Sequence, residues 1–166
     1  MSLIVETGAG ISNSNTYVTR AEYIAYALTL GITVADTSTA DDELVAAAVY
    51  IDSQEPKLKG YRVSRDQSMA YPRDGMYLNG FVWESDEIPT QTKYAQYNLA
   101  LDIKAGIDIY NPDKTDSVVK REKIEGAVEV EYAVTEKGTV TKQSLSNSYM
   151  NILMNNQTMS IPLVMA

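Results

Sequence analysis

Apolar residues recur at helical spacing in two stretches near the beginning of the chain. The first stretch carries apolar positions on one face, at Tyr23, Ile24, Ala27 and Leu28. Thr19 with Glu22 three residues later forms a capping box, in which each residue satisfies a free N–H at the helix start. Gly31 is suited to the position just after the last helical turn. The pattern predicts a helix that begins after Thr19 and ends at Gly31.

The second stretch predicts another helix by the same reasoning. Its apolar positions are Leu44, Val45, Ala48 and Ile51. We expect Thr39 to be the N-cap with Asp42 as its acidic partner. The helix should end near Ser53, because Pro56 disfavours a helical backbone at the residue that precedes it.

Two further helices are predicted later in the chain. Pro89 suits a first helical position after the acidic pair 86–87, and the helix should fade at Gly106. Its inward face consists of Ala95, Leu99 and Ile103. A short helix is expected over Tyr149–Met154, after a polar linker rich in Ser and Thr.

The remaining segments lack a helical period. Residues Pro56 to Ser85 contain three glycines and Pro72, and are expected to form a long irregular loop. Alternating apolar and charged positions on both sides of Gly126 predict a β-hairpin over residues 117–133. The expected fold is mainly α: a small bundle of three core helices with the long loop, one β-hairpin and an extended C-terminal tail. Residues 1–134 would form the helical domain, and 135–166 a linker and docking tail.

The amino-acid composition excludes several classes of function. The chain has 22 Asp and Glu against 14 Lys and Arg, a net charge of −8, and neither Cys nor His. Nucleophilic triads of the usual sort and disulfides are therefore excluded. The acidic pairs near 41 and 86 lie at predicted helix starts, where they complement the helix dipole. We expect no enzyme, no cofactor, no metal site, no secretory signal and no membrane span.

A basic segment stands out against this acidity. Between Lys57 and Arg73 there are five basic residues and one acidic residue, Asp66, interleaved with Tyr61 and Tyr71. Such a mixture could bind single-stranded nucleic acid by charge and stacking. Alternatively, the arginines pair with carboxylates of this chain or of a neighbouring subunit, which the acidic net charge favours.

The segment ends in a stretch, Gln67 to Gly75, that combines an aromatic residue, a proline and an arginine. Pro72 fixes its own backbone and biases Tyr71 toward an extended conformation. We expect a rigid corner that organises the long loop, with Arg73 paired to a carboxylate.

The C-terminal tail is apolar and holds four of the seven Met residues. Two interpretations remain open: the tail folds back onto the core, or it docks on another protein, for which flexible Met side chains are suited.

The chain resembles a family of tailed-phage proteins labelled DnaT-like single-stranded DNA-binding proteins. The resemblance covers roughly residues 1–135 and leaves the tail unmatched. It is carried, in chain order, by Asn15-Thr16-Tyr17-Val18, Ala21-Glu22-Tyr23, Gly60-Tyr61-Arg62, Gln67, Tyr71-Pro72-Arg73, Ile88-Pro89 and the strand pair around Gly126.

The resemblance implies two functions. The first, our main hypothesis, is a head-to-tail adaptor (connector): a homo-oligomeric, dodecameric ring in the virion neck, assembled in the host cytoplasm, through which DNA passes. Its partners would be the portal protein and a tail or nozzle protein. The inter-subunit or partner contacts would be Arg62, Arg65, Tyr71, Pro72 and Arg73; the portal-docking residues would be Tyr149, Ile152, Leu153, Ile161 and Leu163. The alternative is a single-stranded DNA-binding replication protein that uses Tyr61, Tyr71 and the basic segment.

Overall fold

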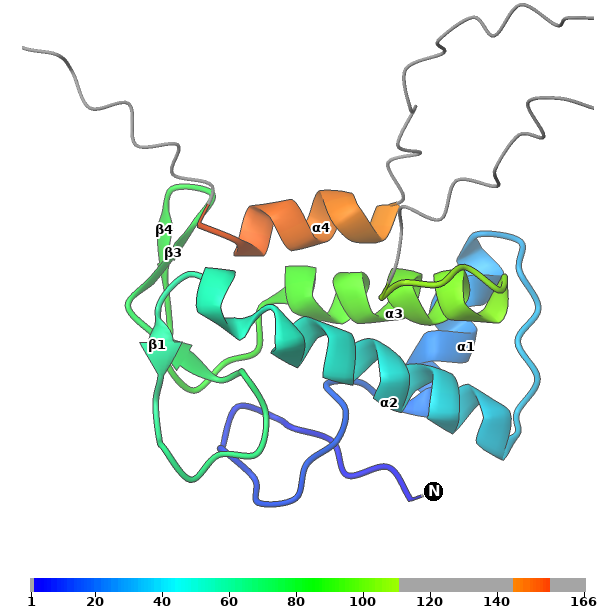
Figure 1. Cartoon of the computed structure of the whole chain (residues 1–166), viewed down its shortest axis with the longest axis horizontal. Helices are drawn as coiled ribbons and strands as arrows, with labels where there is room; N and C mark the ends of the chain where they lie inside the picture. The colour runs from blue at the N-terminus through cyan, green and yellow to red at the C-terminus, as the bar shows by residue number, and fades with distance from the viewer. Residues whose placement is uncertain (1, 111–144, 156–166) are drawn as a thin grey trace, which may run out of the picture.

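The computed structural model describes residues 2–110 and 145–155, which form a layered helical body with two small sheets at one end (Figure 1). Helix α3 lies in the middle, with α4 along one side of it and α2 along the other. Helix α1 lies across the end of this layer that is remote from the sheets. None of these helices is long and apolar enough to cross a membrane.

Helix α1 spans Arg20–Thr29 and confirms the predicted capping box. The Thr19 hydroxyl accepts a hydrogen bond from the Glu22 amide, at 3.2 Å, and the Glu22 carboxylate accepts one from the Thr19 amide, at 2.7 Å. Gly31 follows the helix with a φ of +73°, a backbone conformation that glycine adopts without a side-chain clash.

Helix α2 spans Ser38–Ser53, so its predicted end is correct and its predicted start is wrong. Thr37 is the N-cap and makes no side-chain capping bond, whereas Thr39 lies inside the helix. Tertiary contacts explain the difference, because an ion pair of 3.1 Å joins the buried Asp41 carboxylate to Arg20 of α1. The first turn of α2 is therefore held by α1 and not by a capping box.

Helices α3 (Thr90–Lys104) and α4 (Leu145–Leu153) pack against each other. Pro89 is the N-cap of α3 and not its first helical residue, so the helix begins one residue later than predicted. Helix α4 begins four residues before the predicted Tyr149, in the stretch predicted as a linker. The Ser146 hydroxyl donates to the Asp102 carboxylate of α3 at 2.7 Å, and Met150 and Leu153 are buried. The described core therefore has four helices, one more than predicted.

Tyrosines fill much of the contact between helices α1, α3 and α4. The Tyr26 ring of α1 stacks on Tyr97 of α3, with ring centroids 4.8 Å apart. Tyr94 of α3 lies between Tyr26, at 5.5 Å, and Tyr149 of α4, at 5.3 Å. Tyrosine rings supply apolar area while their hydroxyls stay near polar partners, which explains why this small core uses so many of them.

The stretch predicted as an irregular loop contains regular structure. A 3-10 turn, η1 (Glu55–Lys57), follows α2, and β1 (Tyr61–Arg62) then pairs with β2 (Arg73–Asp74) in an antiparallel sheet. A second antiparallel sheet joins β3 (Met76–Leu78) and β4 (Phe81–Trp83). Asn79 and Gly80 connect them with positive φ, as in tight hairpin turns. The hairpin predicted over 117–133 lies outside the described residues.

Candidate nucleic-acid interface

The corner from Gln67 to Gly75 is held together by the side chain of Gln67, which is buried. Its amide nitrogen donates to the carbonyls of Met69, at 2.9 Å, and Pro72, at 3.0 Å. Its amide oxygen accepts from the Ser64 backbone N–H at 3.0 Å. The Gln67 side chain thus links two carbonyls inside the corner to the preceding loop at Ser64.

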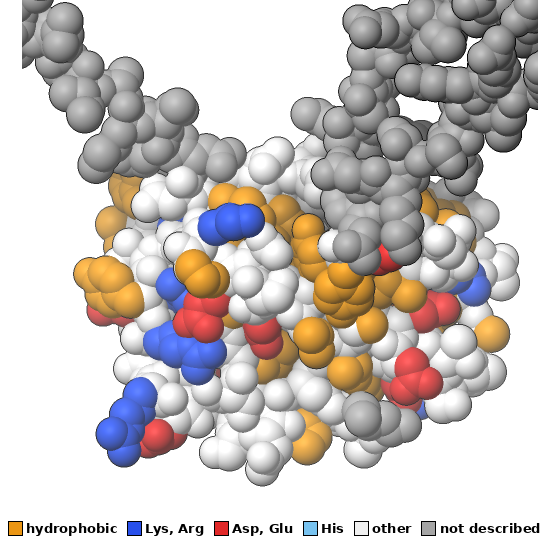
Figure 2. Space-filling view, viewed as in Figure 1, with side chains coloured by type: hydrophobic (Ala, Val, Ile, Leu, Met, Phe, Trp, Pro, Cys, Tyr) orange, Lys and Arg blue, Asp and Glu red, His pale blue; other side chains and the backbone are white. Residues whose placement is uncertain are grey.

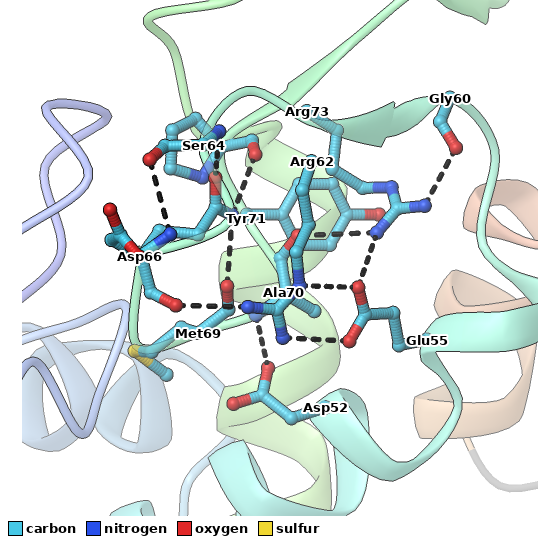
Figure 3. Close-up of polar contacts among 12 residues, drawn as sticks. Asp52, Glu55, Gly60, Arg62, Ser64, Asp66, Met69, Ala70, Tyr71 and Arg73 are labelled. Atoms are coloured by element: carbon cyan, nitrogen blue, oxygen red, sulfur yellow. Dashed lines mark hydrogen bonds and ion pairs between the residues drawn. The ribbon is translucent and has the colours of Figure 1, made fainter.

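Tyr71 points into the core and not toward solvent. The peptide bond between Tyr71 and Pro72 is cis, and the Tyr71 side chain is fully buried. Its ring meets that of Tyr17 edge to face, with centroids 5.9 Å apart (the corner is drawn in Figure 3). Because a base can stack only on an exposed ring, the expectation that Tyr71 stacks on DNA is wrong.

A chain of hydrogen bonds fixes the corner to α2. The Tyr71 N–H donates to the Tyr17 hydroxyl at 3.3 Å, and that hydroxyl donates to Oδ1 of Asp52 at 2.5 Å. The same Oδ1 accepts from the Ala70 N–H at 2.9 Å. Burial raises the pKa of Asp52, and hydrogen bonds from Tyr17 and Ala70 offset part of that rise. Burial, followed by the nearby Asp52 carboxylate, raises the pKa of Tyr17, so the proton stays on the tyrosine.

The Asp52 acceptor predicts different results for two substitutions. Asp52→Ala leaves two buried donors unpaired and should lower the free energy of unfolding by about 2–4 kcal/mol. Asp52→Asn keeps an oxygen acceptor and should remain close to wild type. The folded-state pKa of Asp52 lies above its ordinary value of 3.8, so the group's stabilising contribution is full below that value. That contribution is lost as the pH rises through the folded-state pKa.

Asparagine cannot ionise, so the stability of Asp52→Asn relative to wild type should increase between acid pH and neutrality. Urea unfolding of wild type and Asp52→Asn at several pH values measures this difference in the free energy of unfolding. Equal destabilisation by Ala and Asn would contradict the role of Oδ1 as a shared acceptor.

Arg73 is buried, and backbone carbonyls surround its guanidinium. It donates to the carbonyls of Lys59 at 2.8 Å, Gly60 at 2.6 Å and Ala70 at 3.3 Å. Its remaining contact is an ion pair of 3.5 Å with Glu55, on η1. The carboxylate predicted for Arg73 is therefore supplied by its own chain.

Arg62 shares that carboxylate from the other side. Its Nε and Nη2 donate to the two oxygens of Glu55 at 2.5 and 2.8 Å, and its Nη1 donates to the Gln67 carbonyl at 2.9 Å. Figure 3 shows Glu55 between the two guanidinium groups. The hydrogen bonds from Arg62, helped by the charges of both arginines, lower the pKa of Glu55 although partial burial opposes this. Glu55 therefore stays ionised near neutral pH.

The other basic residues of the segment lie nearer to solvent. The Arg65 side chain is 92% exposed and makes an ion pair of 3.2 Å with Asp66, which is also exposed. Lys57 is exposed and donates to the Gln54 side chain. Lys59 donates to the Ile152 carbonyl at the end of α4, at 2.8 Å. On the face drawn in Figure 2, most Lys and Arg side chains lie toward the end that carries the two sheets.

Three aromatic side chains are exposed on the two sheets. Tyr61 of β1 is 67% exposed, Tyr77 of β3 is 61% exposed and Phe81 of β4 is 73% exposed. The Tyr61 ring covers Gly75, where an added Cβ would lie 3.0 Å from the tyrosine oxygen. We call these three aromatic residues, Tyr61, Tyr77 and Phe81, together with the exposed cation Arg65, the exposed aromatic surface. Sequence reasoning found Tyr61 and missed Tyr77 and Phe81, although the turn at 79–80 marks the hairpin that carries them.

The predicted docking residues of the tail fall into two groups. Leu153 is buried, and Tyr149 and Ile152 are partly buried against the core through α4. Ile161 and Leu163 lie outside the described residues. For residues 145–155, folding back onto the core is therefore what the structure shows, one of the two interpretations of the tail. Among the described residues no cluster of three or more acidic side chains could hold a metal ion.

A family model matches the chain over residues 1–165, and the family is described as "Putative DnaT-like ssDNA binding protein". The chain belongs to this family. Membership in the DnaT-like family thus extends past residue 135, where the resemblance seen in the sequence ended, and it includes α4 and the tail. No curated protein and no solved structure matches the chain.

The family description corrects our main hypothesis. It names single-stranded DNA binding and contains nothing of a virion, a neck, a connector or an adaptor. The adaptor interpretation is therefore wrong, and the alternative that the sequence left open is the one the DnaT-like family supports. The portal, the tail protein and the place in the virion were deduced from the adaptor interpretation and are not carried further.

Proposed function

We propose that this protein binds single-stranded DNA through the exposed aromatic surface. The observation that carries the proposal is membership in the DnaT-like family over nearly the whole chain. The geometry agrees with it in one respect: Tyr61 lies within the basic segment, and its exposed ring covers Gly75, the residue between β2 and β3. Bases can stack on such rings, while nearby cations contact the phosphates.

Only part of the basic segment is open to phosphates. Arg73 is buried and Arg62 is paired with Glu55, so Arg65 and Lys57 are the exposed cations of the basic segment. For single strands, log Kd depends on log salt with a slope of about 0.7 for each phosphate contact. Two such contacts imply a shallow salt dependence, and stacking must then supply most of the affinity.

The net charge of −8 is consistent with this mode of binding. An acidic protein has little non-specific attraction for the phosphates of duplex DNA. Stacking requires unpaired bases, so an aromatic surface discriminates between single strands and duplexes without reading sequence. The proposal therefore includes a preference for single strands and little preference among base sequences.

Replacing Tyr61 with alanine should weaken binding of a fluorescein-labelled oligothymidylate by about 5- to 150-fold, because a stacked base contributes about 1–3 kcal/mol. Fluorescence anisotropy measures the change. The matched control is Tyr110→Ala: Tyr110 is also exposed, but it packs on Tyr50 of α2 and not on the sheets.

Phe81→Ala should reproduce the Tyr61 effect, since Phe81 is exposed on the neighbouring hairpin and its loss removes no hydrogen bond. Wild-type protein that binds labelled duplex as tightly as single strands, or equal losses in the Tyr61 and Tyr110 variants, would refute stacking on this surface.

A further inference from the structure

Glu55 is a carboxylate held by two arginines at the edge of the basic segment. Both of its oxygens accept from Arg62, and one of them also faces Arg73. The Glu55 and Arg62 side chains remain 29% and 32% exposed. The pair is thus accessible from solvent, unlike the Arg73 guanidinium behind it.

The planar fork of Arg62 is filled by this carboxylate. Nε and Nη2 point along the two parallel directions that guanidinium groups use for bidentate contacts with carboxylates and, in the same geometry, with phosphates. The third nitrogen, Nη1, donates to the Gln67 carbonyl. While Glu55 is in place, Arg62 has no free fork for a phosphate group.

We propose that Glu55 occupies the position on Arg62 that a backbone phosphate of single-stranded DNA takes, so that Glu55 limits the affinity of this protein for DNA. This inference rests on the proposed function. Tyr61 and Arg62 are successive residues of β1, so their side chains leave opposite faces of the strand, and a DNA strand that stacks on Tyr61 brings a phosphate to this fork by passing around the edge of the two-stranded sheet. Glu55 is then an internal competitor and the residue that sets the strength of binding.

Arg73 explains why Arg62 is the arginine that changes partner. The Arg73 guanidinium is fixed by three backbone carbonyls, and Glu55 is only its fourth and longest contact. Arg62 makes one backbone contact and gives its two remaining bonds to Glu55. When the Glu55 charge is removed and a phosphate binds Arg62, the corner therefore keeps its Arg73 anchor.

Glu55→Gln tests the inference directly. The amide retains the shape and one oxygen acceptor but loses the negative charge, so a phosphate competes with it more easily on Arg62. We expect the Kd for a labelled oligothymidylate to fall about 3- to 10-fold and the salt slope to steepen by about 0.7, one added phosphate contact. A residue with a purely structural role would not steepen the salt slope.

Glu84→Gln is the matched control, because it removes an equal charge from an exposed residue just after β4 and leaves Glu55, Arg62 and the Arg65–Asp66 pair in place. Its Kd should change less than about 2-fold, because an isolated exposed charge contributes little. An equal gain of affinity in both variants would show that general surface charge, and not the fork of Arg62, controls binding, and would overturn the inference.

Arg62→Ala, made alone and together with Glu55→Gln, supplies a second measurement. In the wild-type background the fork is occupied, so this substitution should change the Kd by less than about 3-fold. In the Glu55→Gln background it should abolish the whole gain. A large loss in the wild-type background, or a gain that survives without Arg62, would contradict competition by Glu55.

Failure of the proposed function can be told apart from failure of this inference. Wild-type binding with no gain in Glu55→Gln overturns the inference alone. If neither protein binds DNA, the proposed function is wrong, and inorganic phosphate then tests the site by NMR of the Arg62 Nε–H. A phosphate-dependent shift in Glu55→Gln and not in wild type supports an anion site that Glu55 blocks; no shift in either overturns it.

Discussion

Arg73→Ala should lower the free energy of unfolding by about 3–5 kcal/mol, the range for loss of one partner from a buried ionic contact. The substitution removes the donors for the carbonyls of Lys59, Gly60 and Ala70 and leaves Glu55 with one arginine. These carbonyls belong to the two segments that β1 and β2 bring together. We therefore expect the β1–β2 sheet to open before the helices do.

Urea unfolding followed by circular dichroism measures the loss, and Arg65→Ala is its control. Arg65 belongs to the same loop but is exposed, so its removal should cost less than about 0.5 kcal/mol. Arg73→Lys should also destabilise, because one ammonium cannot reproduce a fork that reaches three carbonyls. Similar stability of the Arg65 and Arg73 alanine variants would contradict an anchoring role for Arg73.

Gly8→Ala should be comparably severe. Gly8 has a φ of +110°, and a Cβ built there would lie 1.8 Å from the Asp86 carbonyl oxygen. The loop cannot move away easily, since the buried Glu6 carboxylate accepts from the N–H groups of Gly8, Gly10 and Ile11 at 2.7–3.0 Å. Backbone strain of about 1–3 kcal/mol and a steric cost of similar size predict a loss above about 3 kcal/mol.

Gly31→Ala isolates the backbone part of that cost. Gly31 has a φ of +73°, and nothing lies within 4 Å of an added Cβ. Only conformational strain remains, so we expect a loss of about 1–2 kcal/mol in thermal or urea unfolding. Equal losses at Gly8 and Gly31 would show that the contact with Asp86 is relieved by movement of the loop.

The candidate site was only partly predictable from sequence. The basic segment and Tyr61 were recognisable by composition, and an arginine next to a proline in an acidic protein indicated a carboxylate partner. Which carboxylate it would be was not encoded locally, because Glu55 precedes the segment and reaches Arg62 and Arg73 only after η1 turns the chain. Tyr71 was wrongly expected to stack on bases, because nothing near it in the sequence indicates burial. Its burial depends on distant residues: its ring packs on Tyr17, and its N–H donates to the Tyr17 hydroxyl.

The amino-acid sequence by itself determined the helices that local interactions can fix. The capping box at Thr19, the end of α2 at Ser53 and the helix that follows Pro89 each depend on side chains within one or two turns. Only the tertiary structure decided the start of α2, the inclusion of α4 in the core and the exposure of Tyr61, Tyr77 and Phe81.

The physical reason is that these features depend on contacts between residues far apart in the chain. The pair Arg20–Asp41 replaces a cap, and α3 buries the apolar face of α4. The sheets are so short that pairing, and not strand propensity, creates them. Whether a given tyrosine or arginine faces solvent or the core is settled by these distant partners, so the sequence alone does not reveal which side chains form the surface.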